Sequence, residues 1–155
     1  MDDEAIRPAV DKDFPAVAAL RWQWLVEGKG SARSDSKETF VGLFASWLRG
    51  HADTHRCLVV EQDGVLVGFA IVAYFDRVPT AQALERTSAE LQSLYVVPFA
   101  RNTGVGARLI DAALNAARDS GAERITVHSS ERAVTAYVRA GFSSSAQFME
   151  QGLHS

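Results

Sequence analysis

Residues 90–106, ELQSLYVVPFARNTGVG, run from a strand into a helix through a glycine-rich turn. The apolar, strand-like part ends at Pro98, a short polar turn follows, and a helix is expected to begin at about Val105. Glycines in such a turn let the backbone approach a ligand closely, and the first helical N–H groups have no helical partners. The stretch therefore predicts a site for a phosphorylated ligand.

Two known phosphate motifs do not fit this turn. A P-loop requires Lys and then Ser or Thr directly after its last glycine, where this chain has Ala107 and Arg108. The dinucleotide fingerprint requires a third glycine at the position of Leu109. What remains is the pattern Arg-x-x-Gly-x-Gly over residues 101–106.

The composition indicates one soluble globular domain over residues 1–155, with 47% hydrophobic and 23% charged residues. The net charge of −3 and the lack of long basic runs argue against a nucleic-acid partner. No apolar stretch approaches the roughly 20 residues of a membrane span. The acidic N-terminus lacks a signal-peptide core, and Cys57 is the single cysteine, so a cytoplasmic protein without disulfides is expected.

Apolar periodicity and turn residues predict alternating strands and helices. Strands are expected at 5–9, 57–62, 65–74, 89–97, 124–128 and 146–151. Helices are expected at 11–27, 35–50, 105–120 and 131–140. Asp11 is expected to cap the first helix and Gly28 to Gly30 to end it, Asp35 and Glu38 read as a capping box, and Asp63-Gly64 is a hairpin signal.

The order β-α-α-β-β-β-α-β-α-β predicts an α/β mixed sheet, in which an antiparallel meander precedes a βαβ unit. It argues against a Rossmann domain, which opens with alternating β and α units. Between the meander strands, residues 76–88 form a polar loop, with a helical turn considered at 81–86.

A second motif lies at residues 129–142, SSERAVTAYVRAGF. It resembles the segment Asn-x-x-Ala-x-x-x-Tyr-x-Lys/Arg-x-Gly-Phe of the GNAT N-acetyltransferase superfamily, with Ser130 where that family often has Asn. Residues 101–106 resemble the coenzyme A pyrophosphate loop of the same superfamily, and the start Ile6-Arg7-Pro8-Ala9 is similar to its usual opening. The resemblance covers about residues 6–150, and the order of elements is also similar to GNAT topology.

The resemblance implies transfer of an acetyl group from acetyl-CoA to a primary amine, by direct attack through a tetrahedral intermediate. It implies that the backbone of the loop holds the cofactor pyrophosphate and that the strand before it holds the pantetheine arm. The Leu94 N–H would polarise the acetyl carbonyl, and Tyr137 would be the general acid at the sulfur. The cofactor-binding residues implied are Leu94, Tyr95, Val96, Arg101, Asn102, Thr103, Gly104, Val105, Gly106, Ser130 and Tyr137.

Glu90 is the candidate general base, because some GNAT members place a catalytic glutamate four residues before the position of Leu94. Strand alternation predicts that Glu90, Gln92, Leu94 and Val96 share one face, so that Glu90 and the carbonyl site would share a cleft. Other members use ordered water instead. The alternative interpretation is that Glu90 is a solvated carboxylate at the end of the strand.

Several other residues have a plain alternative to a functional role. Tyr95 is expected to be a packing residue of its strand, and Cys57 a small buried apolar residue. His128 could border the acceptor, although a strand-end histidine needs no function. His51 and His55 could be metal ligands, but no metal is expected because no further ligands cluster with them.

The resemblance places the acceptor between the loops at 28–34 and 76–88, with Trp22 or Trp24 near the first. The mixed charges of these two loops do not identify a substrate. A small-molecule amine is expected, with a peptide or protein amine as the alternative. A non-catalytic acyl-CoA-binding or regulatory module is the competing function. The short C-terminal tail offers one strand where the family commonly has two, so a homodimer is considered.

Overall fold

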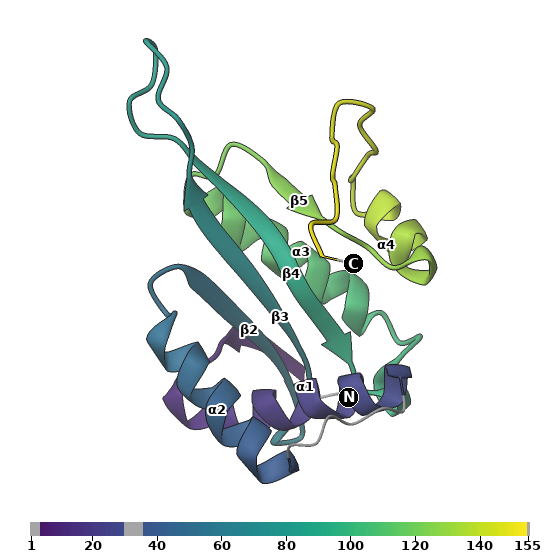
Figure 1. The fold of residues 1–155 in the computed structure, drawn as a ribbon. Helices are drawn as coiled ribbons and strands as arrows, with labels where there is room; N and C mark the ends of the chain where they lie inside the picture. Colours follow the sequence, from purple (N-terminus) through teal and green to yellow (C-terminus); the bar gives the residue numbers. More distant parts are fainter. Residues whose placement is uncertain (1–3, 30–35, 155) are drawn as a thin grey trace.

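The structure is a computed structural model that describes residues 4–29 and 36–154 (Figure 1). Its centre is a five-stranded sheet in the order β1-β2-β3-β4-β5. The strands are β1 (Glu4–Pro8), β2 (His55–Gln62), β3 (Val65–Asp76), β4 (Thr87–Val96) and β5 (Ile125–Val127). The helices are α1 (Phe14–Lys29), α2 (Lys37–Gly50), α3 (Val105–Asp119) and α4 (Val134–Arg139), with short 3-10 turns at Asp11–Asp13, Pro98–Ala100 and Glu131–Ala133.

Helices cover both faces of this sheet. The first four strands pair antiparallel and β5 joins β4 in parallel, so the predicted α/β mixed sheet is confirmed. Helices α1 and α2 lie over one face, called the α1/α2 face, and α3 lies over the other, called the α3 face (Figure 1). Val17, Phe69 and Leu109 are fully buried between these layers.

The N-terminal segment is fixed by an ion-pair network around Arg7. Its guanidinium donates to Asp13 Oδ2 and to Glu61 Oε1, each at 2.7 Å. Asp13 also accepts the Val10 N–H at 2.7 Å, so Asp13 rather than Asp11 caps the turn that leads into α1. The Arg7 guanidinium holds the pKa of Asp13 below its ordinary value.

The hairpin expected at Asp63-Gly64 is confirmed. Both residues have positive φ, 52° and 81°, as a two-residue type I′ turn requires. Gly28 lies within α1, while Gly30 and Asp35 fall outside the described residues. At the start of α2, the Ser36 hydroxyl accepts the Thr39 N–H at 3.2 Å.

Two expected elements are wrong. Residues 81–86 form no helical turn; the 77–86 loop instead extends the β3–β4 hairpin, with the Arg77 N–H donating to the Arg86 carbonyl at 2.9 Å. Residues 146–151 form no strand, because their apolar side chains have no layer to pack against: Phe148 is 63% and Met149 86% exposed. The homodimer stays a prediction.

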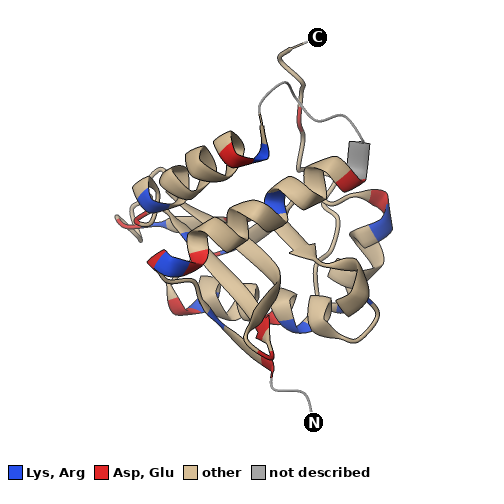
Figure 2. Cartoon of the chain, turned by 90° about the horizontal axis from the view of Figure 1, so that it is seen from below, with Lys and Arg blue, Asp and Glu red and all other residues tan. Residues whose placement is uncertain are grey.

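The surface carries mixed charge. Figure 2 shows Lys and Arg interspersed with Asp and Glu along the helices and strands. None of the helices in the described part of the chain has the length and apolar content to cross a membrane.

Candidate active site

The loop at residues 101–106, called the glycine loop, has the backbone geometry of an anion site. Asn102 and Gly104 have φ of 63° and 88°, and α3 begins directly afterwards at Val105. In the described part of the chain, the N–H groups of Val105, Gly106 and Ala107 have no hydrogen-bond partner. Alternating backbone handedness followed by a helix N-terminus gives a concave set of free donors, which fits a phosphate group.

The two loop glycines have different surroundings. A Cβ built on Gly106 meets nothing within 4 Å, so the space beside the free N–H groups is open. A Cβ on Gly104 lies 2.8 Å from Arg108 Nη1 and would sit on a residue of positive φ. Gly104 is therefore required by the turn itself, whereas Gly106 leaves room for a ligand.

Arg101 points back toward the protein. Its Nε donates to the Val96 carbonyl at 2.9 Å and its Nη2 to Glu27 Oε1 at 2.6 Å. Glu27 also accepts the Tyr95 hydroxyl at 2.8 Å, and Arg101 lowers the pKa of Glu27. Arg101 thus ties the glycine loop to α1, and Tyr95 belongs to the same network.

Strand β4 loses one neighbour midway along its length. Its parallel pairs with β5 end at Leu91 and Val127, and β5 stops there. Near the end of β4 the Val97 N–H donates to Val67 of β3 at 2.9 Å. Because backbone groups alternate along a strand, the N–H groups of Leu94 and Val96 point the other way, toward the side that β5 has left.

A β-bulge at Gln92 changes which residues of β4 share a face. Ser93 pairs with Ile71 and Leu91 with Val72, so Gln92 is the extra residue. The side chains of Glu90, Ser93 and Tyr95 consequently lie on the α1/α2 face. Those of Leu94 and Val96 lie on the α3 face with Leu91, so the predicted sharing of one face by Glu90 and Leu94 is wrong. Alternation fails because the bulge shifts its phase by one residue.

Glu90 has polar neighbours on the α1/α2 face. Gln92 Nε2 donates to Glu90 Oε1 at 2.8 Å. His55, Ala73 and Glu90 form one row across β2, β3 and β4, with only the alanine methyl between the other two. Burial, and then the neighbouring His51, lower the pKa of His55.

The proximity of His55 to Glu90 was not expected from the sequence. The 63–64 turn alone would not have indicated it, because its register, continued without a break, would align His55 with Val72. An irregularity at Val67 shifts the pairing by one residue and places His55 opposite Ala73. The His51 ring donates from Nδ1 to the Trp47 carbonyl at 2.8 Å and stacks on the Trp47 ring, with centroids 4.0 Å apart. Among the described residues no group of three His, Cys, Asp or Glu side chains is arranged to hold a metal ion.

Tyr137 lies in α4 with its ring edge against Phe142, at a centroid distance of 5.4 Å. Only 8% of Tyr137 is exposed, and burial raises its pKa. Within the described chain its hydroxyl has no hydrogen-bond partner, and Leu94 packs against the same core cluster. Ser130 precedes this helix as an exposed residue whose side chain makes no capping bond.

The residues expected near the acceptor are placed only in part. Trp22 packs on Phe40 of α2, with ring centroids 5.6 Å apart, and Trp24 is 40% exposed. His128 is exposed beside Glu150, with Nε2 3.7 Å from the carboxylate. Residues 30–35 of the first acceptor loop lie outside the described residues.

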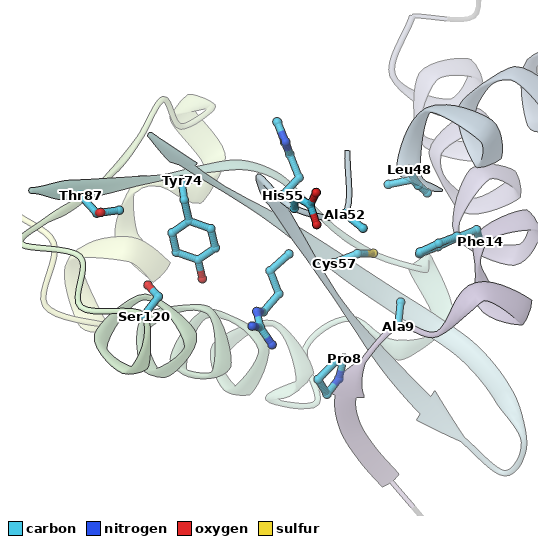
Figure 3. Close-up of a pocket in the computed structure, with 12 residues that line it drawn as sticks. Pro8, Ala9, Phe14, Leu48, Ala52, His55, Cys57, Tyr74, Thr87 and Ser120 are labelled. Atoms are coloured by element: carbon cyan, nitrogen blue, oxygen red, sulfur yellow. The ribbon is translucent and has the colours of Figure 1, made fainter. Parts of the chain in front are cut away.

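A cavity of about 480 Å³ lies at the opposite end of α3 from the glycine loop (Figure 3). Pro8, Cys57, Tyr74 and Ser120 are among its lining residues. Because α3 has 15 residues, its two ends are about 22 Å apart. This cavity is therefore separate from the glycine loop. The Tyr74 hydroxyl is buried without a hydrogen-bond partner among the described residues.

Known proteins share this sequence pattern and fold. Residues 15–142 match the model of the acetyltransferase (GNAT) family. YhfO, an uncharacterized N-acetyltransferase of Bacillus subtilis (strain 168), is 27% identical in an alignment that covers 96% of each chain. The chain therefore belongs to the GNAT family, and as a member it is an acetyl-CoA-dependent N-acetyltransferase.

Solved structures agree on the fold. A predicted acetyltransferase from Clostridium acetobutylicum, solved with acetyl-CoA, superposes with a TM-score of 0.76 at 19% identity, covering 97% of this chain and 96% of its own. Aminoglycoside N-acetyltransferase AAC(6')-Iy, solved with CoA, gives a TM-score of 0.73 at 19% identity, covering 98% and 95%.

Proposed function

We propose that this chain, acting as one domain over residues 1–155, moves the acetyl group of acetyl-CoA to a primary amine of a small molecule. One observation carries the proposal: the free N–H groups of the glycine loop follow directly on the half of β4 that has lost its parallel neighbour. That arrangement supplies donors for a pyrophosphate and an open strand edge for an amide-containing arm. Acetyl-CoA would supply an acetyl thioester at this edge.

Each chemical task has a candidate residue. Glu90 takes a proton from the acceptor nitrogen, so that the nitrogen lone pair can form the new bond to the acetyl carbon. The Leu94 N–H donates to the carbonyl oxygen as negative charge develops there. Tyr137 donates its phenolic proton to the sulfur as the carbon–sulfur bond breaks. The raised pKa of Tyr137 keeps that proton in place at neutral pH.

The bulge at Gln92 suits this division of labour. It turns Glu90 toward the α1/α2 face while the Leu94 N–H stays in the plane of the sheet, on its open side. Glu90 would then approach the acceptor amine from the α1/α2 face. The Leu94 N–H would hold the acetyl carbonyl at the open edge of the strand. Water acting in place of Glu90 is the alternative. A non-catalytic acyl-CoA-binding module would have no use for an unpartnered tyrosine hydroxyl.

Release of free thiol from acetyl-CoA tests the proposal on a panel of small amines and short peptides. In Tyr137→Phe, kcat should fall about 100-fold or more, because the general acid is lost, while the acetyl-CoA Kd stays the same. Tyr74→Phe is the matched control, since it removes a buried hydroxyl without a described partner and should leave kcat unchanged. Turnover by Tyr137→Phe at the wild-type rate would contradict the acid role.

A further inference from the structure

Arg21 lies on the α1/α2 face without a carboxylate partner in the described chain. Its Nη1 donates to the Ser93 hydroxyl at 3.2 Å, and its guanidinium lies over the Trp24 ring, with Cζ 4.4 Å from the centroid. Ser93 directly precedes Leu94 in β4. Burial lowers the pKa of Arg21. A desolvated guanidinium is costly unless an anion completes its hydrogen bonds, so this position suits an anionic ligand group.

Glu27, which accepts the Tyr95 hydroxyl of β4, already has a cation beside it. Glu27 is neutralised by Arg101 at 2.6 Å. Among the described residues, that leaves Glu90 without a cation and Arg21 without an anion on the same face. Glu90 and Ser93 pair with Ala73 and Ile71, which are adjacent same-face positions of β3. Such positions are about 7 Å apart, so one small molecule could reach both charges.

We propose that the acceptor is an amine that also carries a carboxylate, as a free amino acid does, and that Arg21 binds this carboxylate while Glu90 faces the amine. The inference rests on the proposed function and adds the class of substrate. A guanidinium and a hydroxyl together suit a group with one negative charge. A phosphate monoester carries nearly two, and Arg21 would neutralise only part of it.

The test compares matched acceptors. Each free amino acid of a panel is assayed beside its methyl ester and its decarboxylated amine. Phosphoethanolamine is assayed as well, because its phosphate monoester carries nearly two negative charges. In the wild type, kcat/KM should be about 10- to 100-fold higher for the acid than for the ester, which is the size of a charge-assisted hydrogen bond. Arg21→Gln should remove that preference by lowering only the value for the acid. Arg21→Lys should keep part of it, because it retains charge but not the planar fork.

Two controls separate binding of the acceptor from damage to the fold. Arg118→Gln removes an exposed arginine of α3 and should change none of these ratios. The acetyl-CoA Kd of Arg21→Gln should equal that of the wild type.

Any one of three results would overturn this inference and leave the proposed function intact. They are equal kcat/KM for acid and ester in the wild type, an equal loss for both in Arg21→Gln, or an Arg21-dependent preference for phosphoethanolamine. Failure to acetylate any amine would overturn the proposed function, and this inference with it.

Discussion

Two sides of β4 are proposed as sites, the cofactor side at the glycine loop and the acceptor side on the α1/α2 face, and they would use different parts of the chain. At the glycine loop the useful groups are backbone N–H donors, exposed by Gly104 and by the start of α3. On the α1/α2 face the useful groups are side chains, above all Glu90 and Arg21. Backbone sites depend on a few neighbouring residues, whereas the side-chain site depends on a bulge and on how α1 packs over the sheet. The acceptor side should therefore be easier to alter without loss of cofactor binding.

Glu90→Gln separates the two sides most strongly. It should lower kcat about 100-fold or more, because the amine loses its base, and leave the acetyl-CoA Kd unchanged. Steady-state kinetics and calorimetry on one preparation measure both quantities. Glu38→Gln, at an exposed position in the first turn of α2, serves as the control. A wild-type kcat in Glu90→Gln would favour water as the base.

Gly68→Ala tests the β3–β4 contact that both sides share. The added Cβ would lie 2.8 Å from the Tyr95 carbonyl oxygen, so a strand must shift, and the free energy of unfolding should fall by about 1–3 kcal/mol. Gly42→Ala in α2 meets nothing within 4 Å and should raise it by about 0.5–1 kcal/mol. Urea unfolding measures both, and equal stability of the two variants would refute the close contact.

Glu27 connects the two sides, because it holds both Arg101 and Tyr95. The ion pair is about one-third exposed on each partner, so a double-mutant cycle of Glu27→Gln and Arg101→Gln should give a coupling energy of up to about 1 kcal/mol. Glu27→Gln should also weaken acetyl-CoA binding a few-fold, since the glycine loop loses its tie to α1. Zero coupling would show that the loop is positioned without this pair.

His55 gives the smallest expected effect, which depends on pH. Burial lowers its pKa from the ordinary value of 6.5, so the folded protein favours the neutral ring. The stability that His55 contributes is therefore complete above pH 6.5 and is lost as pH falls through the folded-state pKa. An NMR titration should place its midpoint below 6.5, and His55→Gln should flatten the acid side of the stability curve. A midpoint at or above 6.5 would contradict the burial of this ring.

The sequence predicted features whose signals are local. Asp63-Gly64 specifies its own turn, and the glycine loop needs only its spacing after a strand. The bulge at Gln92 has no local signal, because either phase of alternation satisfies the apolar pattern of β4. For the same reason neither the row from His55 to Glu90 nor the contact between Arg21 and Ser93 could be derived without the register. The strand predicted at 146–151 does not form, because the alternating residues there have no sheet to pair with.

Gly106→Glu tests whether the glycine loop holds the pyrophosphate of acetyl-CoA. A side chain at Gly106 meets nothing within 4 Å, and a glutamate in the first helical turn suits the helix dipole, so the variant should fold. Gly42→Glu, at an equally open helical glycine, is the control. Calorimetry should show acetyl-CoA binding to the wild type and to Gly42→Glu, and none to Gly106→Glu. Unchanged binding in a folded Gly106→Glu would place the cofactor elsewhere and contradict this account of the site.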